Sequence, residues 1–245
     1  MKNNETGHAK NVANMEKMVA ICTSFGNDYN PSYEPIQLTN LQTKAQTTKD
    51  CISAIDASQP LWSNAVMQRQ EAFNPLDKLV TRTSNALKVV VSSEKVNENA
   101  RTYIRKIHGQ RAKPKMTEEE KQEAEAKGEK IVEHSAAQTS YDSKVANFSK
   151  YIQFLATIAE YKPNEEELTV EALTTYCEDL KAKNIAVVNA EAAIKAERVK
   201  RDKELYDGNE GLVVLASKVK AYVKSIYGSN SIQFKQLSSL KFVKH

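Results

Sequence analysis

Val145-Ala146-Asn147-Phe148, followed by Tyr161-Lys162-Pro163-Asn164, is the stretch that decides the fold, because most of it occurs twice in the chain. Near the N-terminus the sequence reads Val12-Ala13-Asn14-Met15 and then Tyr29-Asn30-Pro31-Ser32. A repeated string of this kind is the signature of a duplicated structural unit. The repeat predicts an architecture, and it names no substrate, cofactor or reaction.

The first helix of each repeat is predicted from a matching apolar face. In the first repeat, apolar residues recur at steps of three and four, which places them on one side of a helix over about 9–23. The second repeat has apolar or aromatic residues at all five positions 133 residues later. The two sets are Val12, Met15, Met18, Val19 and Cys22, and Val145, Phe148, Tyr151, Ile152 and Leu155. We expect both faces to be buried.

A Tyr-x-Pro turn then leads into a long second helix. Ser32 and Asn164 stand at the predicted N-cap, where their side chains would accept from the free N–H groups of the first turn. No Gly or Pro interrupts 165–206, which predicts a rod on the order of 60 Å at about 1.5 Å per residue. In the first repeat we expect Pro60 to kink or break the corresponding helix.

A third apolar helix and a short tail complete each repeat. The third helix is strongly apolar over 212–226 and weaker over 80–91, and the tails cover 100–108 and 232–242. The second tail is open to three interpretations: it lies on a membrane, docks a partner, or folds back over its own bundle, which we favour. The fold class is therefore all-α, a tandem duplication of an antiparallel helical-bundle unit with long helices. Its predicted parts are a first repeat unit 1–110, a charged linker 111–136 and a second repeat unit 137–245.

Composition agrees with helices and excludes several function classes. Seven glycines and six prolines in 245 residues are too few for the turns of a β-sandwich or barrel. The net charge of +4 is divided as +3 over 1–110, −1 over 111–136 and +2 over 137–245. A nucleic-acid-binding protein usually concentrates its excess charge, so this spread favours a solvated surface. No signal peptide or membrane-spanning run is recognisable, and we expect a cytoplasmic protein.

No catalytic, cofactor or metal site is predicted. The three cysteines are widely spaced and form no C-x-x-C pair, which argues against disulfides and zinc, and the four histidines have no ligand at metal spacing. These residues are Cys22, Cys51, Cys177, His8, His108, His134 and His245. We expect the histidines on the solvated surface. A G-x-S-x-G motif and a phosphate-binding glycine loop are missing from the sequence, so we expect no cofactor and no small-molecule substrate.

The best electrostatic candidate is a basic cluster at the end of the first repeat. It contains Arg101, Arg105, Lys106, His108, Arg111, Lys113 and Lys115. Such a cluster could bind phosphates or an anionic membrane surface. The alternative is a helix end whose cations complement the helix dipole, followed by a solvated linker, and the acidic residues from Glu118 onward would offset the charge.

Four strings carry a resemblance to a known group of proteins. They are GHAKNVANMEK at 7–17, RKIHGQRAKPK at 105–115, TSYDSKVANFSKYIQFL at 139–155 and QFKQLSSLKF at 233–242. The chain resembles, over nearly its whole length, a family of tandem-repeat helical proteins from Bacteroidota that has no established activity. The resemblance therefore implies no catalytic or binding residue.

Three functions remain open from the sequence. The first is a non-enzymatic structural or protein-interaction role, with a homo-oligomer or another protein as partner. The second is a membrane-acting, pore-forming type of helical protein, although no hydrophobic hairpin is visible. The third is association with nucleic acid through 101–115.

Overall fold

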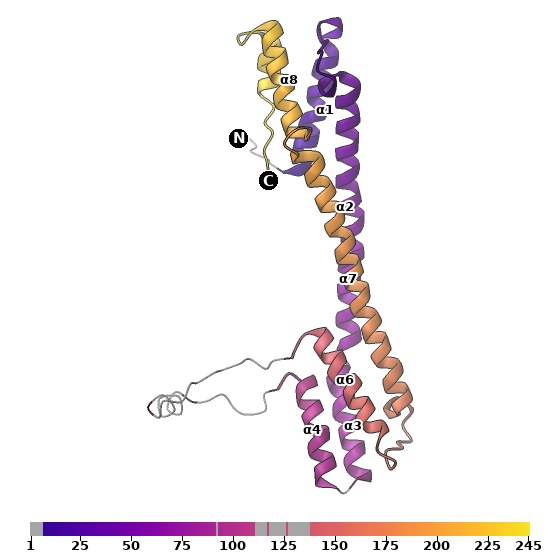
Figure 1. Cartoon of the computed structure of the whole chain (residues 1–245). Coiled ribbons are helices and arrows are strands. Elements are labelled where there is room, and N and C mark those ends of the chain that lie inside the picture. The colour runs from indigo at the N-terminus through magenta and orange to yellow at the C-terminus, as the bar shows by residue number, and fades with distance from the viewer. Residues whose placement is uncertain (1–6, 92, 111–116, 118–125, 127–137) are drawn as a thin grey trace, which may run out of the picture. The chain divides into compact units, whose positions relative to one another are not determined.

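The chain folds into α-helices in a computed structural model that describes residues 7–91, 93–110, 117, 126 and 138–245 (Figure 1). The helices are α1 (His8–Ser24), α2 (Leu38–Phe73), α3 (Leu76–Val90), α4 (Glu94–Ile107), α6 (Tyr141–Ala156), α7 (Val170–Tyr206), α8 (Leu212–Tyr227) and α9 (Ile232–Ser238). Three short 3-10 helices are η1 (Gly26–Asp28), η2 (Glu34–Ile36) and η3 (Glu166–Leu168). The described residues contain no strand, which confirms the all-α class.

The helices form two compact units that divide the chain differently from the predicted repeats. Unit 1 combines residues 1–63 with 189–245, and unit 2 consists of residues 64–188. Each unit thus takes chain from both predicted repeat units, 1–110 and 137–245, and α2 and α7 contribute residues to both. The predicted linker 111–136 lies outside the described residues except at positions 117 and 126. The tandem duplication itself stays a prediction.

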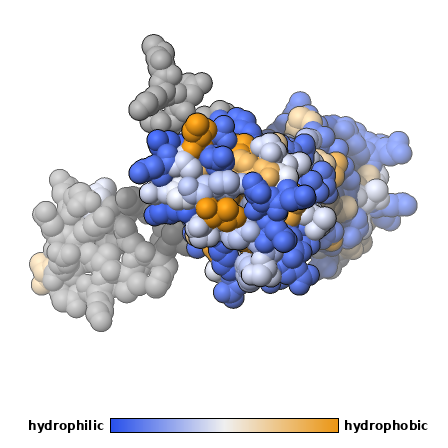
Figure 2. All heavy atoms as spheres, turned by 90° about the horizontal axis from the view of Figure 1, so that it is seen from above, coloured by the Kyte–Doolittle hydropathy of each residue, from blue (hydrophilic) through white to orange (hydrophobic). Residues whose placement is uncertain are grey.

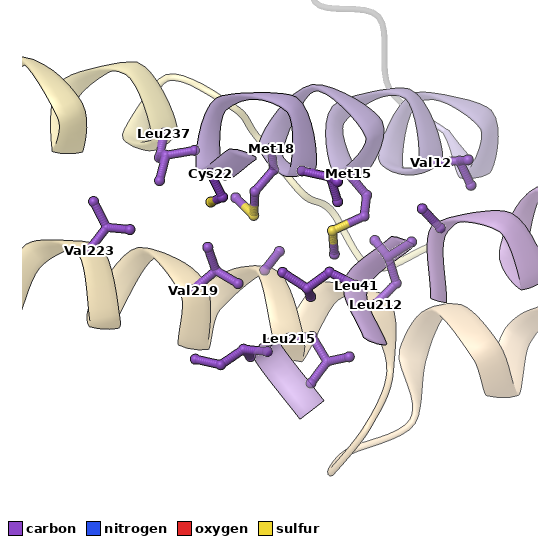
Figure 3. Close-up of a cluster of buried hydrophobic side chains, with 14 of the residues drawn as sticks. Val12, Met15, Met18, Cys22, Leu41, Leu212, Leu215, Val219, Val223 and Leu237 are labelled. Carbon is purple, nitrogen blue, oxygen red and sulfur yellow. The ribbon is translucent and has the colours of Figure 1, made fainter. Parts of the chain in front are cut away.

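Unit 1 is built around α1 and α8. Helix α8 packs against α1, α9 and η2, and α1 also contacts α9. Figure 3 shows side chains from these elements pointing into one cluster. Its fully buried members are Met15, Met18, Cys22, Leu41, Leu205, Leu212, Ala216, Val219, Val223 and Leu237. Leu240 and Phe242 pack against the same cluster, and the Asn14 amide donates to the Lys241 carbonyl at 2.7 Å. The prediction that the second tail folds back is confirmed.

Unit 2 has a corresponding core around α6. Helix α4 packs against α6 and α3, and α3 also contacts η3. The fully buried members of this core are Leu76, Val80, Leu87, Ile107, Phe148, Tyr151, Leu155, Leu173 and Leu180. All five predicted face positions of α1 and all five of α6 are buried, which confirms both faces.

The predicted N-caps of the long helices are wrong. A 3-10 turn, η2 or η3, separates Ser32 from α2 and Asn164 from α7. Two matching hydrogen bonds fix these turns: the Tyr29 hydroxyl donates to the Ile36 carbonyl at 2.7 Å, and the Tyr161 hydroxyl donates to the Leu168 carbonyl at 2.8 Å. The hydroxyl of Thr169 accepts from the Ala172 N–H at 3.2 Å and so caps α7.

Helix α2 continues through Pro60, so the predicted break does not occur. Proline removes one backbone hydrogen bond and crowds the preceding turn. The residues on either side of Pro60 nevertheless remain helical from Leu38 to Phe73.

Candidate functional surfaces

The basic cluster predicted from the sequence is only partly described. Arg101, Arg105 and Lys106 lie on α4, whereas Arg111, Lys113 and Lys115 lie outside the described residues. Arg101 and Lys106 are exposed and Arg105 is half-buried, because Ala100 and Ile107 form the buried side of the helix. The structure therefore describes three of the six lysines and arginines of the cluster, together with His108 directly after α4.

Acidic residues interrupt the charge of α4. Glu94 and Glu98 stand one helical turn apart at its beginning, and Arg101 lies 3.4 Å from the Glu94 carboxylate. Exposed ion pairs of this kind contribute little to stability, but they occupy one of the cations. The described part of the cluster is thus a mixed surface that carries Arg105 and Lys106 near its C-terminal end, where cations complement the helix dipole.

His8 is not the solvated histidine that the sequence predicted. Its Nδ1 lies 2.8 Å from the Tyr206 hydroxyl, and the Asn11 amide donates to the same hydroxyl at 3.4 Å. Asn11 also holds the backbone of Val243, donating to its carbonyl at 2.7 Å and accepting from its N–H at 3.1 Å. Burial, followed by the positive charge of Arg201, lowers the pKa of His8. This network anchors the C-terminal segment of unit 1.

A cavity of about 280 Å³ adjoins His8 and is lined by residues of unit 1 that include Ile52, Asp56 and Arg201. Unit 2 contains a larger hollow of about 550 Å³, lined by Phe73, Tyr141 and Lys144 among others. There the Arg69 guanidinium lies 4.1 Å from the centre of the Tyr141 ring, and Lys144 lies 3.8 Å from Asp77. In this hollow Lys144 thus lies beside a carboxylate, and Arg69 stacks on an aromatic ring.

The cysteines and the most strongly shifted tyrosines belong to the cores. Cys22, Cys51 and Cys177 are buried free thiols. Burial raises the pKa of Cys22 to about 12, which keeps it protonated and unreactive at neutral pH. Burial also raises the pKa of Tyr29 and of Tyr161. Among the described residues, no group of three or more His, Cys, Asp or Glu side chains is placed to hold a metal ion.

Unit 1 carries a second basic surface, of which the sequence analysis singled out only the tail at 232–242. From Gly211 to His245 the chain carries six lysines and no Asp, Glu or Arg. Helices α8 and α9, which belong to this segment, pack against each other in unit 1. The signal was visible in the sequence, but it was averaged with the acidic residues of 137–210 into a net charge of only +2.

Comparison with known proteins adds no identification. No protein-family profile, curated protein or solved structure matches the chain. The resemblance to the Bacteroidota family accordingly stays a prediction. Among the described residues, no helix combines the length and the apolar character needed to cross a membrane.

Proposed function

We propose that the chain is a non-enzymatic helical interaction protein that self-associates through the outer face of α7 within unit 2. The observation that carries this proposal is the exposure of Ile185 and Val188, which are 59% and 61% accessible. They are three residues apart and lie on the same side of α7, since residues three and four apart are neighbours on a helix surface. Two adjacent aliphatic side chains on a regular helix are suited to contact a second helix.

The surroundings of the pair fit a contact between identical surfaces. Ala182 and Ala186 are exposed beside it and allow close helix approach. One turn earlier, Lys181 and Glu178 form an ion pair at 2.7 Å, so the border of the patch is electrically balanced. In a two-fold dimer the same patch faces itself, and a balanced border avoids repulsion between like charges.

The chemistry of the cores supports a role without catalysis. The strongly raised pKa values belong to Cys22, Tyr29 and Tyr161, and burial is the first cause of each. Their partners are core atoms: Tyr29 and Tyr161 donate to backbone carbonyls, and Cys22 lies in the packed cluster of unit 1. These groups serve packing and turn formation.

Size-exclusion chromatography with light scattering tests the proposal. We expect the wild-type mass to rise with concentration, and we expect Ile185→Glu combined with Val188→Glu to remain monomeric. Val89→Glu is the matched control, because Val89 is an 85% exposed aliphatic residue of unit 2 on α3. A wild-type protein that stays monomeric throughout, or a control that dissociates the dimer equally, would refute this interface.

A further inference from the structure

The turn between α8 and α9 of unit 1 is rigid and locally defined. Helix α8 ends at Tyr227 and is followed by Gly228, whose φ of 81° is a left-handed conformation that favours glycine. The Ser231 hydroxyl donates to the Gly228 carbonyl at 2.8 Å and accepts from the Phe234 N–H at 3.1 Å, which caps α9. The residues on both sides of the turn are therefore held in fixed positions.

This turn presents aliphatic side chains to solvent. Ile226 precedes it and is 41% exposed, and Ile232 follows it and is 72% exposed. The neighbouring rings are packed at the base: Tyr227 lies 5.4 Å from Phe25 between ring centres, and Phe234 packs against the core cluster. Figure 2 shows hydrophobic patches among hydrophilic residues on the face it displays. We call Ile226, Ile232 and the turn between them the tip; its exposed aliphatic side chains lie beside packed aromatic rings.

Lysines stand on both sides of the tip. Lys224 and Lys235 are exposed, and the Lys224 ammonium lies 5.8 Å from the centre of the Phe234 ring. Within the described part of the chain, none of the six lysines from 211 to 245 forms an ion pair with a carboxylate. The acidic side chain that contacts the turn is Asp28, 3.4 Å from the Tyr227 hydroxyl. The local excess of charge is positive.

We propose that this tip docks the protein onto an anionic phospholipid surface. Ile226 and Ile232 would enter the boundary between headgroups and acyl chains, while Lys224 and Lys235 contact the headgroup phosphates, as expected of an amphipathic surface with cations beside its apolar residues. Docking of this kind needs no membrane-spanning helix. It goes beyond the self-association proposed above and uses a different unit.

A membrane surface fits the tip better than a nucleic acid does. Both partners supply phosphates for the lysines. A nucleic acid would leave Ile232 in water, and the segment 211–245 contains no arginine for bidentate phosphate or base contacts. Of these two partners, only the lipid surface accounts for both the cations and the exposed aliphatic residues.

Co-sedimentation with vesicles tests the proposal on the full chain. We expect binding to vesicles of phosphatidylcholine with phosphatidylglycerol, weaker binding to phosphatidylcholine alone, and a decrease with added salt. Ile232→Ser should weaken binding about tenfold, because one aliphatic side chain leaves the membrane. Lys224→Gln and Lys235→Gln should each weaken it about fivefold. The matched control is Lys88→Gln with Val89→Ser, an exposed lysine and aliphatic residue of unit 2.

Three results would overturn the proposal. The first is no sedimentation of the wild-type protein with the anionic vesicles at low salt. The second is an equal loss of binding in the unit 2 control. The third is tight, salt-dependent binding to duplex DNA together with vesicle binding that Ile232→Ser leaves unchanged, which would assign the lysines to nucleic acid. Circular dichroism of each variant separates loss of binding from loss of folding.

Discussion

Units 1 and 2 bury the same positions with different chemistry. Along the first helix of each predicted repeat, the five face positions of α1 and α6 are all buried. Unit 1 fills the two central places with Met15 and Met18, whereas unit 2 fills the places 133 residues later with Phe148 and Tyr151. The pattern of buried positions is kept while the size and type of the side chains change, which a core tolerates when its neighbouring side chains repack.

The difference is sharpest where the first helix meets the third. Thr83 of α3 and Leu215 of α8 are 132 residues apart and are both buried. In unit 2, the hydroxyl groups of Thr83 and Tyr151 share a buried hydrogen bond of 3.2 Å. In unit 1, the apolar Met18 and Leu215 lie in one cluster (Figure 3). Unit 2 thus has a polar pair where unit 1 is wholly apolar.

The largest expected effect comes from emptying the central position of each unit. Phe148→Ala should lower the free energy of unfolding by about 4 kcal/mol and Met15→Ala by about 3 kcal/mol, because the aromatic ring leaves the larger cavity. Denaturant unfolding followed by circular dichroism measures both values. Hydrogen exchange of α6 and α1 then shows which unit loosens.

Val89→Ala serves as the control for this comparison. Its side chain is exposed, so it should change stability by less than about 0.5 kcal/mol. If Met15→Ala proved as mild as this control, the two first helices would not carry comparable cores.

Breaking the polar pair of unit 2 should lower the free energy of unfolding by less than the two core truncations do. Thr83→Val removes the partner of a buried Tyr151 hydroxyl and should lower stability by about 1–2 kcal/mol. Adding Tyr151→Phe removes the orphaned hydroxyl as well, so the double variant should be more stable than Thr83→Val alone. A double-mutant cycle from urea unfolding measures this coupling. Additive losses would mean that the two hydroxyl groups do not interact.

The features of the fold that the sequence predicted correctly are those determined by residues close together in the chain. The faces of α1 and α6 were predicted correctly, because helical periodicity is read from neighbours in sequence. The first turns of the long helices were missed at Ser32 and Asn164. There the 3-10 turns depend on tyrosine hydroxyls that reach carbonyls seven residues away.

The arrangement into units lay beyond sequence pattern. Nothing in the periodicity of α2 or α7 indicates which half of each long helix belongs to which core, since that depends on tertiary packing. The basic surface, by contrast, could have been predicted, because the lack of acidic residues in 211–245 is visible in the sequence. Only the structure shows that Ile232 remains exposed beside those lysines while Leu237 is buried.

Removing the two turn-forming hydroxyls should show what the units have in common. Tyr29→Phe and Tyr161→Phe each delete one buried hydrogen bond to a carbonyl and should each lower stability by about 1 kcal/mol. Thermal unfolding of the two variants measures the losses, with Tyr33→Phe as a control because this residue is 43% exposed. A loss of stability in only one of the two variants would mean that the two hydrogen bonds contribute unequally to stability despite their similar lengths.

The smallest effect concerns pH and distinguishes His8 in unit 1 from Tyr141, the residue 133 positions later in unit 2. Because burial and Arg201 lower the pKa of His8 from its ordinary value of 6.5, the folded state binds fewer protons there than the unfolded state. As pH falls through 6.5, the unfolded chain takes up a proton first, so the stability contributed by neutral His8 declines until the pH lies below its folded pKa. His8→Gln should flatten this decline, and His8→Tyr should do the same while copying the residue of unit 2. Midpoints of thermal unfolding across this pH range, subtracted from those of the wild type, isolate His8 because every other titrating group is shared. Parallel curves for the wild type and both variants would show that burial and Arg201 do not favour the neutral imidazole, and the two units would then respond alike to acid.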